Sequence, residues 1–372
     1  MSHDINRNMQ KVLYRQSDYP VLQNRVYATA EEAKACIKGD IEIVENQLTG
    51  LIYNDAFRPE LMVYDASYNN EQGVSRQFRS HLESVAELIE VFLGKRSLIE
   101  VGCGKGFFLG MLLERGVDVT GFDSTYDGDN PRVIKKYFEP GIIKKPANGL
   151  ILRHVLEHIQ NPVDFLLRLK EANGGKGLIY IEVPCFDWIC EHRAWFDIFY
   201  EHVNYFRLSD FRRMFGRVIK SGKLFGDQYI YVIADLESLR QPTFEKIDAV
   251  TFPSDFVSDL NFVDRQTDRQ TDRQTDRQTD RRPLFCVWGG ASKGVIFSLL
   301  RERAGLPVDV VIDVNPAKQG KYLPATGILV QPPEIALPKL PADTLIYVMN
   351  SNYLEEIKDM SNHFFNYIGI DQ

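Results

Sequence analysis

The sequence predicts an α/β protein that is built on parallel sheets and contains more than one domain. Short apolar runs typical of buried strands, such as 97–101, 117–122 and 178–183, alternate with stretches whose apolar residues follow helical spacing. Strands that alternate with helices form parallel sheets covered by helices on both faces. A chain of 372 residues is also long enough for two or three domains.

The elements of the first domain follow one another regularly from Ser75 onward. Ser75 can cap a helix whose apolar residues at 78, 82, 85, 89 and 92 have helical spacing, and Gly94 would close it. Further elements are predicted in chain order: a strand at 97–101, a helix at 107–115, strands at 117–122 and 149–152, a helix at 162–170 and a strand at 178–183. Apolar runs at 218–219 and 229–234 predict an antiparallel hairpin at one edge of the sheet.

A four-residue repeat, DRQTDRQTDRQTDRQTDR, occupies residues 264–281 and contains no apolar side chain. Such a segment cannot contribute to a core, so we interpret it as a solvated linker without a function of its own. The predicted organisation is an N-terminal region at 1–74, a domain at 75–255, a linker at 256–282 and a C-terminal domain at 283–372.

Composition excludes several classes of function. The net charge of −7 provides no basic field for nucleic acid phosphates. Residues 1–10 are polar, unlike a signal peptide, and no apolar run approaches the roughly 18 residues of a membrane span. The five cysteines lack paired spacing, which favours neither a disulfide framework nor a zinc site. We therefore expect a cytoplasmic protein that binds neither nucleic acid nor membrane.

The strongest local motif is a glycine-rich turn between a strand and a helix. Gly102, Gly104 and Gly106 follow Glu100, and Asp123 ends the next strand, where a carboxylate can accept both hydroxyls of a ribose. The spacing G-x-G-x-G differs from the G-x-G-x-x-G of dinucleotide sites. A turn needed only for packing is the alternative.

This turn resembles motif I of class I S-adenosylmethionine-dependent methyltransferases. The resemblance implies S-adenosylmethionine as cofactor, with Glu100 serving its amino-acid end. His154 follows the strand at 149–152, and we expect it to shape the cofactor pocket, although capping a helix is an alternative for it and for His158.

Chemistry-bearing residues are concentrated after the strand at 178–183, beyond the carboxyl end where ligands of such sheets bind. Two Glu-His pairs occur there, Glu191-His192 and Glu201-His202. A histidine can remove a proton near neutral pH, and a neighbouring acid can raise its basicity. Aromatic residues around the second pair would exclude water and shape a sugar pocket. Arg193 could meet a phosphate.

Several runs together resemble the C-methyltransferases of deoxysugar biosynthesis, which methylate C3 of nucleotide-linked 4-keto sugars. The runs are Tyr-Glu-His-Val-Asn-Tyr-Phe at 200–206, Leu-Arg-His-Val-Leu-Glu-His at 152–158, Trp-Gly-Gly-Ala-Ser-Lys-Gly at 288–294 and Asp-Val-Asn-Pro-Ala-Lys-Gln-Gly at 313–320. They extend the resemblance from about residue 50 to the end of the chain. The resemblance implies that His202 takes the proton alpha to the ketone, supported by Glu201 and Tyr200, with Tyr205 contacting the substrate.

The C-terminal domain is predicted to be a second Rossmann-like α/β unit. A strand at 284–288 leads into a glycine turn and a helix that ends near residue 303, and further strands lie at 308–312 and 345–349. Gly290, Ser292 and Lys293 in the turn suit a diphosphate. The resemblance assigns the nucleotide end of the substrate to this domain, where Asp313 and Asn350 also follow strands. A redox dinucleotide, with Asp313 on its ribose, and a purely structural domain remain alternatives.

The N-terminal region departs from the family. Members often begin with a zinc domain built on paired cysteines, but Asn46 and Thr49 stand in the expected cysteine places, and neither is a good zinc ligand. We therefore predict no metal. Tyr68 lies in a run that still resembles the family and either contacts the sugar or packs in the core.

The function predicted from the sequence is S-adenosylmethionine-dependent C-methylation of a nucleotide-linked 4-keto deoxysugar by a monomer or weak homodimer. O- or N-methylation of a sugar or small metabolite is one alternative. A non-catalytic protein that binds nucleotide sugars is another.

Overall fold

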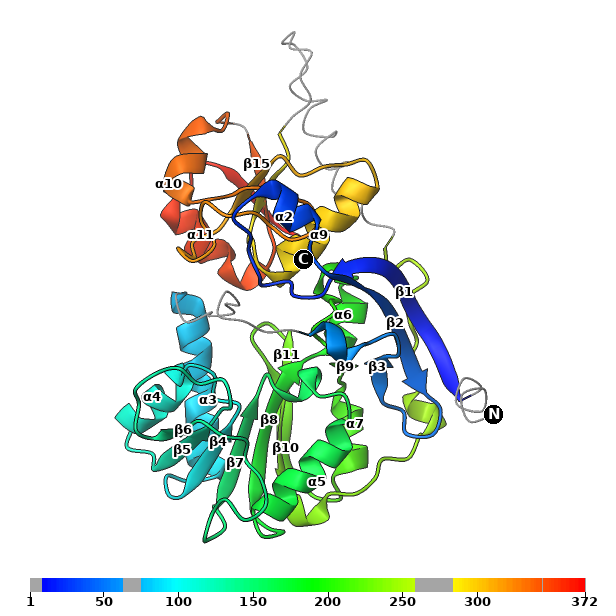
Figure 1. Ribbon diagram of the computed structural model, residues 1–372, viewed down its shortest axis with the longest axis vertical. Helices are drawn as coiled ribbons and strands as arrows, with labels where there is room; N and C mark the ends of the chain where they lie inside the picture. Colours follow the sequence, from blue (N-terminus) through cyan, green and yellow to red (C-terminus); the bar gives the residue numbers. More distant parts are fainter. Residues whose placement is uncertain (1–8, 63–74, 258–283, 343, 372) are drawn as a thin grey trace.

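The computed structural model describes residues 9–62, 75–257, 284–342 and 344–371. Strands in these ranges form a seven-stranded sheet, a four-stranded sheet and a five-stranded sheet (Figure 1). Tyr68 and the repeat at 264–281 lie outside the described residues, so the predictions for them are not tested. No helix in the described ranges combines the length and apolarity that crossing a bilayer requires.

The seven-stranded sheet confirms the predicted α/β class. Its order is β10-β11-β8-β7-β4-β5-β6, in which the strands from β8 to β6 are parallel and β11 is antiparallel to both neighbours. The hairpin therefore lies at one edge, as predicted. The strands are β4 (Leu98–Val101), β5 (Val119–Phe122), β6 (Val133–Ile134), β7 (Gly149–Arg153), β8 (Leu178–Pro184), β10 (Val218–Leu224) and β11 (Tyr229–Asp235).

Three helices of this part begin and end close to the predicted residues, and two shorter ones were not predicted. In α3 (Arg76–Phe92), the Ser75 side chain accepts a hydrogen bond from the Phe78 amide, and the residues at 78, 82, 85 and 89 are buried. The remaining helices are α4 (Phe107–Glu114), α5 (Pro162–Ala172), α6 (Phe186–Glu191) and α7 (Leu208–Met214).

The N-terminal region forms a sheet that the sequence did not predict. β1 (Gln10–Pro20), β2 (Lys38–Asn46) and β3 (Ile52–Asn54) pair antiparallel, and β9 (Asn204–Tyr205), from the Tyr-Glu-His run, extends the sheet beside β3. Register shifts between Val12 and Tyr14 and between Gln16 and Tyr19 break the alternation of β1. This explains why a strand period was not visible in the sequence.

The five-stranded sheet is parallel throughout and confirms the predicted C-terminal α/β unit. Its strands, in the order β14-β13-β12-β15-β16, are β14 (Val330–Gln331), β13 (Val310–Ile312), β12 (Cys286–Trp288), β15 (Leu345–Val348) and β16 (Asn366–Gly369). Its helices are α9 (Ser292–Arg303), α10 (Pro333–Ala336) and α11 (Leu354–Met360).

Contacts join the three sheets. The N-terminal region reaches the C-terminal unit through two backbone hydrogen bonds between Tyr27 and Tyr322, and α2 (Ala30–Lys34) lies beside that unit in Figure 1. The rings of Trp195 and Phe297 stack at 5.4 Å and join the segment after α6 to α9. The predicted domain boundaries at residue 74 and at 256–282 stay a prediction.

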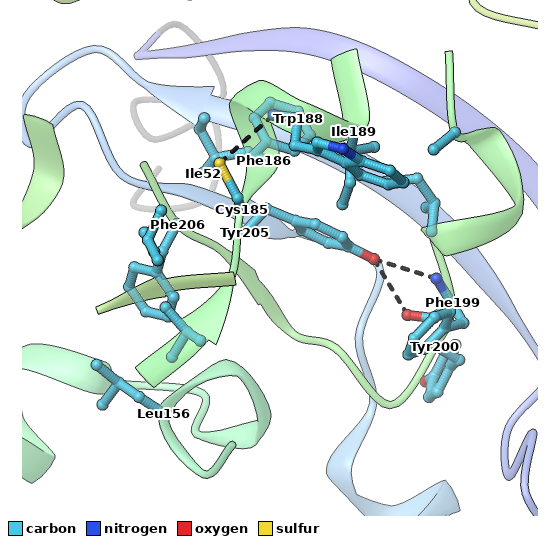
Figure 2. Packing of buried hydrophobic residues seen from close by; sticks show 14 of the residues in the cluster. Ile52, Leu156, Cys185, Phe186, Trp188, Ile189, Phe199, Tyr200, Tyr205 and Phe206 are labelled. Carbon is cyan, nitrogen blue, oxygen red and sulfur yellow. Dashed lines mark hydrogen bonds between the residues drawn. The ribbon is translucent and has the colours of Figure 1, made fainter. Parts of the chain in front are cut away.

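The largest hydrophobic cluster includes the segment that carries the Tyr-Glu-His run (Figure 2). Tyr205 is a buried member of this cluster, and its hydroxyl accepts from the Phe199 amide at 3.2 Å and donates to the Phe199 carbonyl at 3.1 Å. These bonds link the Tyr205 side chain to the Phe199 backbone and thereby fix the turn formed by the residues between them.

Gly294→Ala should destabilise the C-terminal unit, because the added methyl group would lie 1.8 Å from the Gly289 carbonyl oxygen. We expect a loss of about 3 kcal/mol, at the upper end of overpacking costs. Gly110→Ala is the matched control, since a methyl group there meets no atom within 4 Å in a helix. Thermal unfolding of both variants checks this; an unchanged transition for Gly294→Ala would contradict the packing described for the turn.

Candidate active site

The glycine turn after β4 is shaped to admit a ligand. Gly102, Gly104 and Gly106 all have positive φ, at 72°, 54° and 76°, which side chains rarely adopt. The Gly104 amide donates to Asp123 Oδ2 at 2.8 Å, so the acid at the end of β5 lies beside the turn, as predicted. A methyl group at Gly104 would meet no atom within 4 Å, which leaves open space over the backbone.

Glu100 provides a second feature of this site. The residue is 3% exposed, and its Oε2 has no hydrogen-bond partner among the described residues. Burial raises the pKa of the carboxyl to about 7, although Arg153 lowers it. A buried oxygen without a donor fits an ammonium group, and Asp123 fits ribose hydroxyls. The residues present therefore fit S-adenosylmethionine, which Glu100, Asp123 and the turn would hold.

A cavity of about 310 Å³ lies between the seven-stranded and five-stranded sheets. The segments after β7 and after α6 form one wall, and the glycine turn before α9 forms the other. The lining includes the predicted residues His154, Glu201, His202, Ser292, Lys293, Asp313 and Asn350. The structure thus brings together residues that are up to 196 positions apart in the chain, from His154 to Asn350.

His202 lies in this cavity beside other aromatic rings. Its ring centroid is 4.1 Å from that of Phe199 and 5.1 Å from that of His158. Burial, followed by electrostatic interactions with His158, His154 and Lys293, holds the pKa of His202 well below its usual range. The imidazole is therefore neutral at neutral pH and has a lone pair available.

His154 is held in the opposite protonation state. Its Nδ1 is 3.2 Å from Glu157 Oε1 and its Nε2 is 3.0 Å from Glu182 Oε1, so both nitrogens face carboxylates. Burial alone would lower the pKa, but the two carboxylates raise it to about 9. The backbone at His154 has a φ of 50°, a strained value for a non-glycine residue. His154 is thus a fixed imidazolium on the cavity wall.

The segment that follows β7 connects the glycine turn to the cavity. A Cβ at Gly102 would lie 2.5 Å from Val155 Cγ2, which shows how closely this segment packs on the turn. His154 and His158, on either side of Val155, line the cavity. The segment after β7 therefore packs on the glycine turn and also contributes His154 and His158 to the cavity that His202 lines.

The C-terminal wall provides ammonium and amide groups. Lys293 Nζ lies 3.1 Å from Asp197 Oδ2 and 2.9 Å from Gln228 Oε1, which ties α9 to the opposite wall. The Gly290 amide donates to Asp313 Oδ2 at 2.7 Å, so this amide is used within the turn and Gly290 is not among the lining residues.

Several predicted site residues do not line the cavity. Besides Gly290, they are the predicted catalytic and substrate residues Arg193, Tyr200 and Tyr205 and the predicted cofactor residues Glu100, Gly102, Gly104, Gly106 and Asp123. Arg193 pairs with Asp255 at 2.9 Å, and Tyr205 is bonded to Phe199 in the core. Tyr200 packs against Phe57, and its hydroxyl accepts from the Arg58 amide at 2.8 Å. Their direct roles with substrate stay predictions; the observed contacts give Tyr200 and Tyr205 a positioning role for the turn between them.

Several lining residues were not singled out from the sequence. Asn24, Glu157, Asp197, Tyr229 and Lys318 all contribute. Burial lowers the pKa of Lys318, whose Nζ lies 3.3 Å from Asn24 Oδ1. The motifs at 152–158 and 313–320 contain two of these residues, so their sequence signal was present. Asn24 had none, because only the fold brings the N-terminal region to this wall.

Comparison with known proteins identifies the reaction class. Residues 60–218 match the family model of a methyltransferase domain. The chain contains a methyltransferase domain. The enzyme is thus a methyltransferase, and its methyl donor is S-adenosylmethionine, which the glycine turn, Glu100 and Asp123 fit. No curated protein sequence is significantly similar to the chain.

Three solved structures illustrate a partial similarity to the methyltransferase. The first is the PH0226 protein from Pyrococcus horikoshii OT3, which is 14% identical in sequence. The similarity covers 48% of this chain and 99% of that one, with a TM-score of 0.35. A second is the 1,6-didemethyltoxoflavin-N1-methyltransferase of Burkholderia thailandensis, at 13% identity, 50% and 95% coverage and a TM-score of 0.33. A third is a SAM-dependent methyltransferase from Aquifex aeolicus, at 15% identity, 42% and 97% coverage and a TM-score of 0.30.

Asp123→Ala should weaken binding of S-adenosylmethionine at least about tenfold, because each hydrogen bond to a charged group contributes about 1.5–3 kcal/mol. Asp127→Ala, an exposed acid in the same loop, is the control. Isothermal titration calorimetry measures both variants. Equal affinity in the Asp123 variant would remove this residue from the cofactor site.

Proposed function

We propose that this methyltransferase transfers a methyl group to the carbon alpha to the ketone, C3, of a nucleotide-linked 4-keto deoxysugar. The observation that carries the proposal is the cavity, which is lined both by the neutral imidazole of His202 and by Ser292 and Lys293 of the glycine turn. A base on one wall and a phosphate-type site on the other suit a substrate with a reactive sugar and an anionic nucleotide.

The C-terminal wall favours a phosphorylated ligand. Lys293 and Lys318 bring two ammonium groups to the lining, in a protein whose net charge is −7. Lys318 is buried and Lys293 is half-buried, and both lie near acids, with Lys293 paired to Asp197. Since a diphosphate would satisfy these cations better than one carboxylate, we infer that the nucleotide end lies here and the sugar beside His202.

The reaction follows from the state of His202. When bound, S-adenosylmethionine supplies an electrophilic methyl group on a sulfonium. The neutral imidazole takes the proton from C3 of the sugar, and the C–H electron pair becomes part of an enolate. Held by Glu100, Asp123 and the glycine turn, the cofactor would supply the methyl group for this carbon and would keep the electron pair of the cleaved C–S bond. Phe199 and the buried turn at 200–205 exclude water and hold the ring in place.

His202→Asn should abolish turnover, by at least about a hundredfold, while leaving the affinity for S-adenosylmethionine intact. His192→Asn is the matched control, because His192 belongs to the other Glu-His pair and its Nδ1 donates to the Asp371 carbonyl at 2.8 Å. Labelled methyl transfer to a panel of nucleotide 4-keto sugars provides the assay. Near-normal turnover in the His202 variant would exclude it as the base.

The position of the methyl group tests the reaction type. We expect the carbon NMR spectrum of the product to show a methyl carbon attached to carbon, because the base lies where a C–H bond would be broken. A methyl signal typical of attachment to oxygen or nitrogen would overturn C-methylation, and the chain would then be an O- or N-methyltransferase.

A nucleoside diphosphate should protect residues 289–294 from hydrogen exchange, because Ser292 and Lys293 line the cavity. The protection should be lost in Lys293→Met, which keeps the length of the side chain but removes its charge. Protection confined to other parts of the chain would place the nucleotide elsewhere.

A further inference from the structure

We propose that Glu157, His158 and His202 form a binding site for a divalent transition-metal ion, with Zn²⁺ the best suited, and that the bound ion inhibits the enzyme. One ligand atom from each residue lies within 4.8 Å of the other two. The binding itself is independent of the proposed function. The inhibition rests on it, because the ion would occupy the imidazole assigned as base.

Glu157 is a carboxylate with an unused oxygen. Its Oε1 faces the His154 imidazolium at 3.2 Å, whereas its Oε2 is buried and has no hydrogen-bond partner in the described part of the chain. The residue is 1% exposed. A buried carboxylate oxygen without a donor is rare and costly, which indicates a missing cationic partner.

His158 is oriented as a metal-binding histidine. Its Nδ1 lies 2.7 Å from the Glu201 carbonyl oxygen, which can only accept, so Nδ1 carries the proton. The lone pair is therefore on Nε2, the other side of the ring. Metal-ligating histidines commonly donate their second nitrogen to a backbone carbonyl in this way, which fixes the tautomer.

His202 supplies the third group and lies beside the other two. Its ring stands edge-to-face with that of His158, at 5.1 Å between centroids. All three residues line the cavity, so an ion and its remaining water ligands can enter.

The ligand set selects the ion. Two imidazoles and one carboxylate suit Zn²⁺ and its first-row neighbours, whereas Mg²⁺ and Ca²⁺ prefer oxygen ligands alone. Three protein ligands with an open position are typical of reactive rather than structural zinc sites. Bonds of about 2.0–2.1 Å require ligand atoms about 3.3 Å apart, so groups that now lie within 4.8 Å of one another must approach by at most about 1.5 Å.

The sequence predicts no metal, since Asn46 and Thr49 replace zinc-binding cysteines. That expectation concerned paired residues of the N-terminal region. The present cluster joins adjacent residues at 157 and 158 to a histidine 44 positions later, which have no spacing typical of a metal motif.

The test uses the full chain after treatment with a chelator and desalting. Calorimetric titration with ZnCl₂ should show one strong site, and Glu157→Gln and His158→Asn should each weaken it at least about tenfold. His363→Asn is the control, since this exposed histidine pairs with Asp359 and lies outside the cluster. Affinity for S-adenosylmethionine verifies that each variant is folded.

Co²⁺ provides a readout without substrate. A visible d–d spectrum of four- or five-coordinate Co²⁺, lost in Glu157→Gln, supports the site. An intense thiolate band would instead assign the ion to one of the five free cysteines and overturn the proposal, as would unchanged Zn²⁺ affinity in both variants. Activity that is unaffected at saturating Zn²⁺ would overturn the inhibitory role. If no keto sugar were methylated, the titration and the spectrum would still decide the binding.

Discussion

The active-site architecture depends on one buried carboxylate, that of Glu182 in β8. It accepts hydrogen bonds from Arg153, His154, His81 and Tyr180, which lie on α3, on β7 and just after it, and on β8 itself. Burial opposes the charge, but these donors hold the pKa of Glu182 well below its ordinary value. A fully buried anion with four donors is stable only while every donor stays in place, so it fixes α3, β7 and β8 relative to one another.

This anion also determines the form of the cavity. His154 is charged because it lies between Glu182 and Glu157, and its strained backbone turns the chain from β7 into the segment that lines the cavity. The charge on His154 and the burial of His202 together keep the second imidazole neutral. Two histidines that line the same cavity are thereby held in opposite protonation states by their surroundings.

The second constraint is the connection among the three sheets. The Tyr-Glu-His run contributes β9 to the N-terminal sheet, and Tyr205 anchors the same run in the core. The N-terminal region bonds to the C-terminal unit between Tyr27 and Tyr322, and Lys293 reaches Asp197 across the cavity. The cavity wall is built from separate segments, and it is rigid because each segment is also bonded to another part of the protein. Catalytic groups are held in position by supporting contacts of this kind.

Local sequence determined the α/β class, most strand and helix positions, and the glycine turn with Asp123. It also showed that residues able to act in catalysis are concentrated around residue 202. These features could be predicted because helix period, capping and glycine turns are encoded over a few residues. It did not predict β1, whose bulges break the strand period, or β9, whose two residues form a strand only beside β3. Tertiary structure alone decided that Tyr205 is a buried anchor, that Arg193 pairs with Asp255, and that Asn24 and Lys318 reach the cavity. Those outcomes depend on contacts between distant segments and on burial, which set pKa values and partners and which no short stretch of sequence contains.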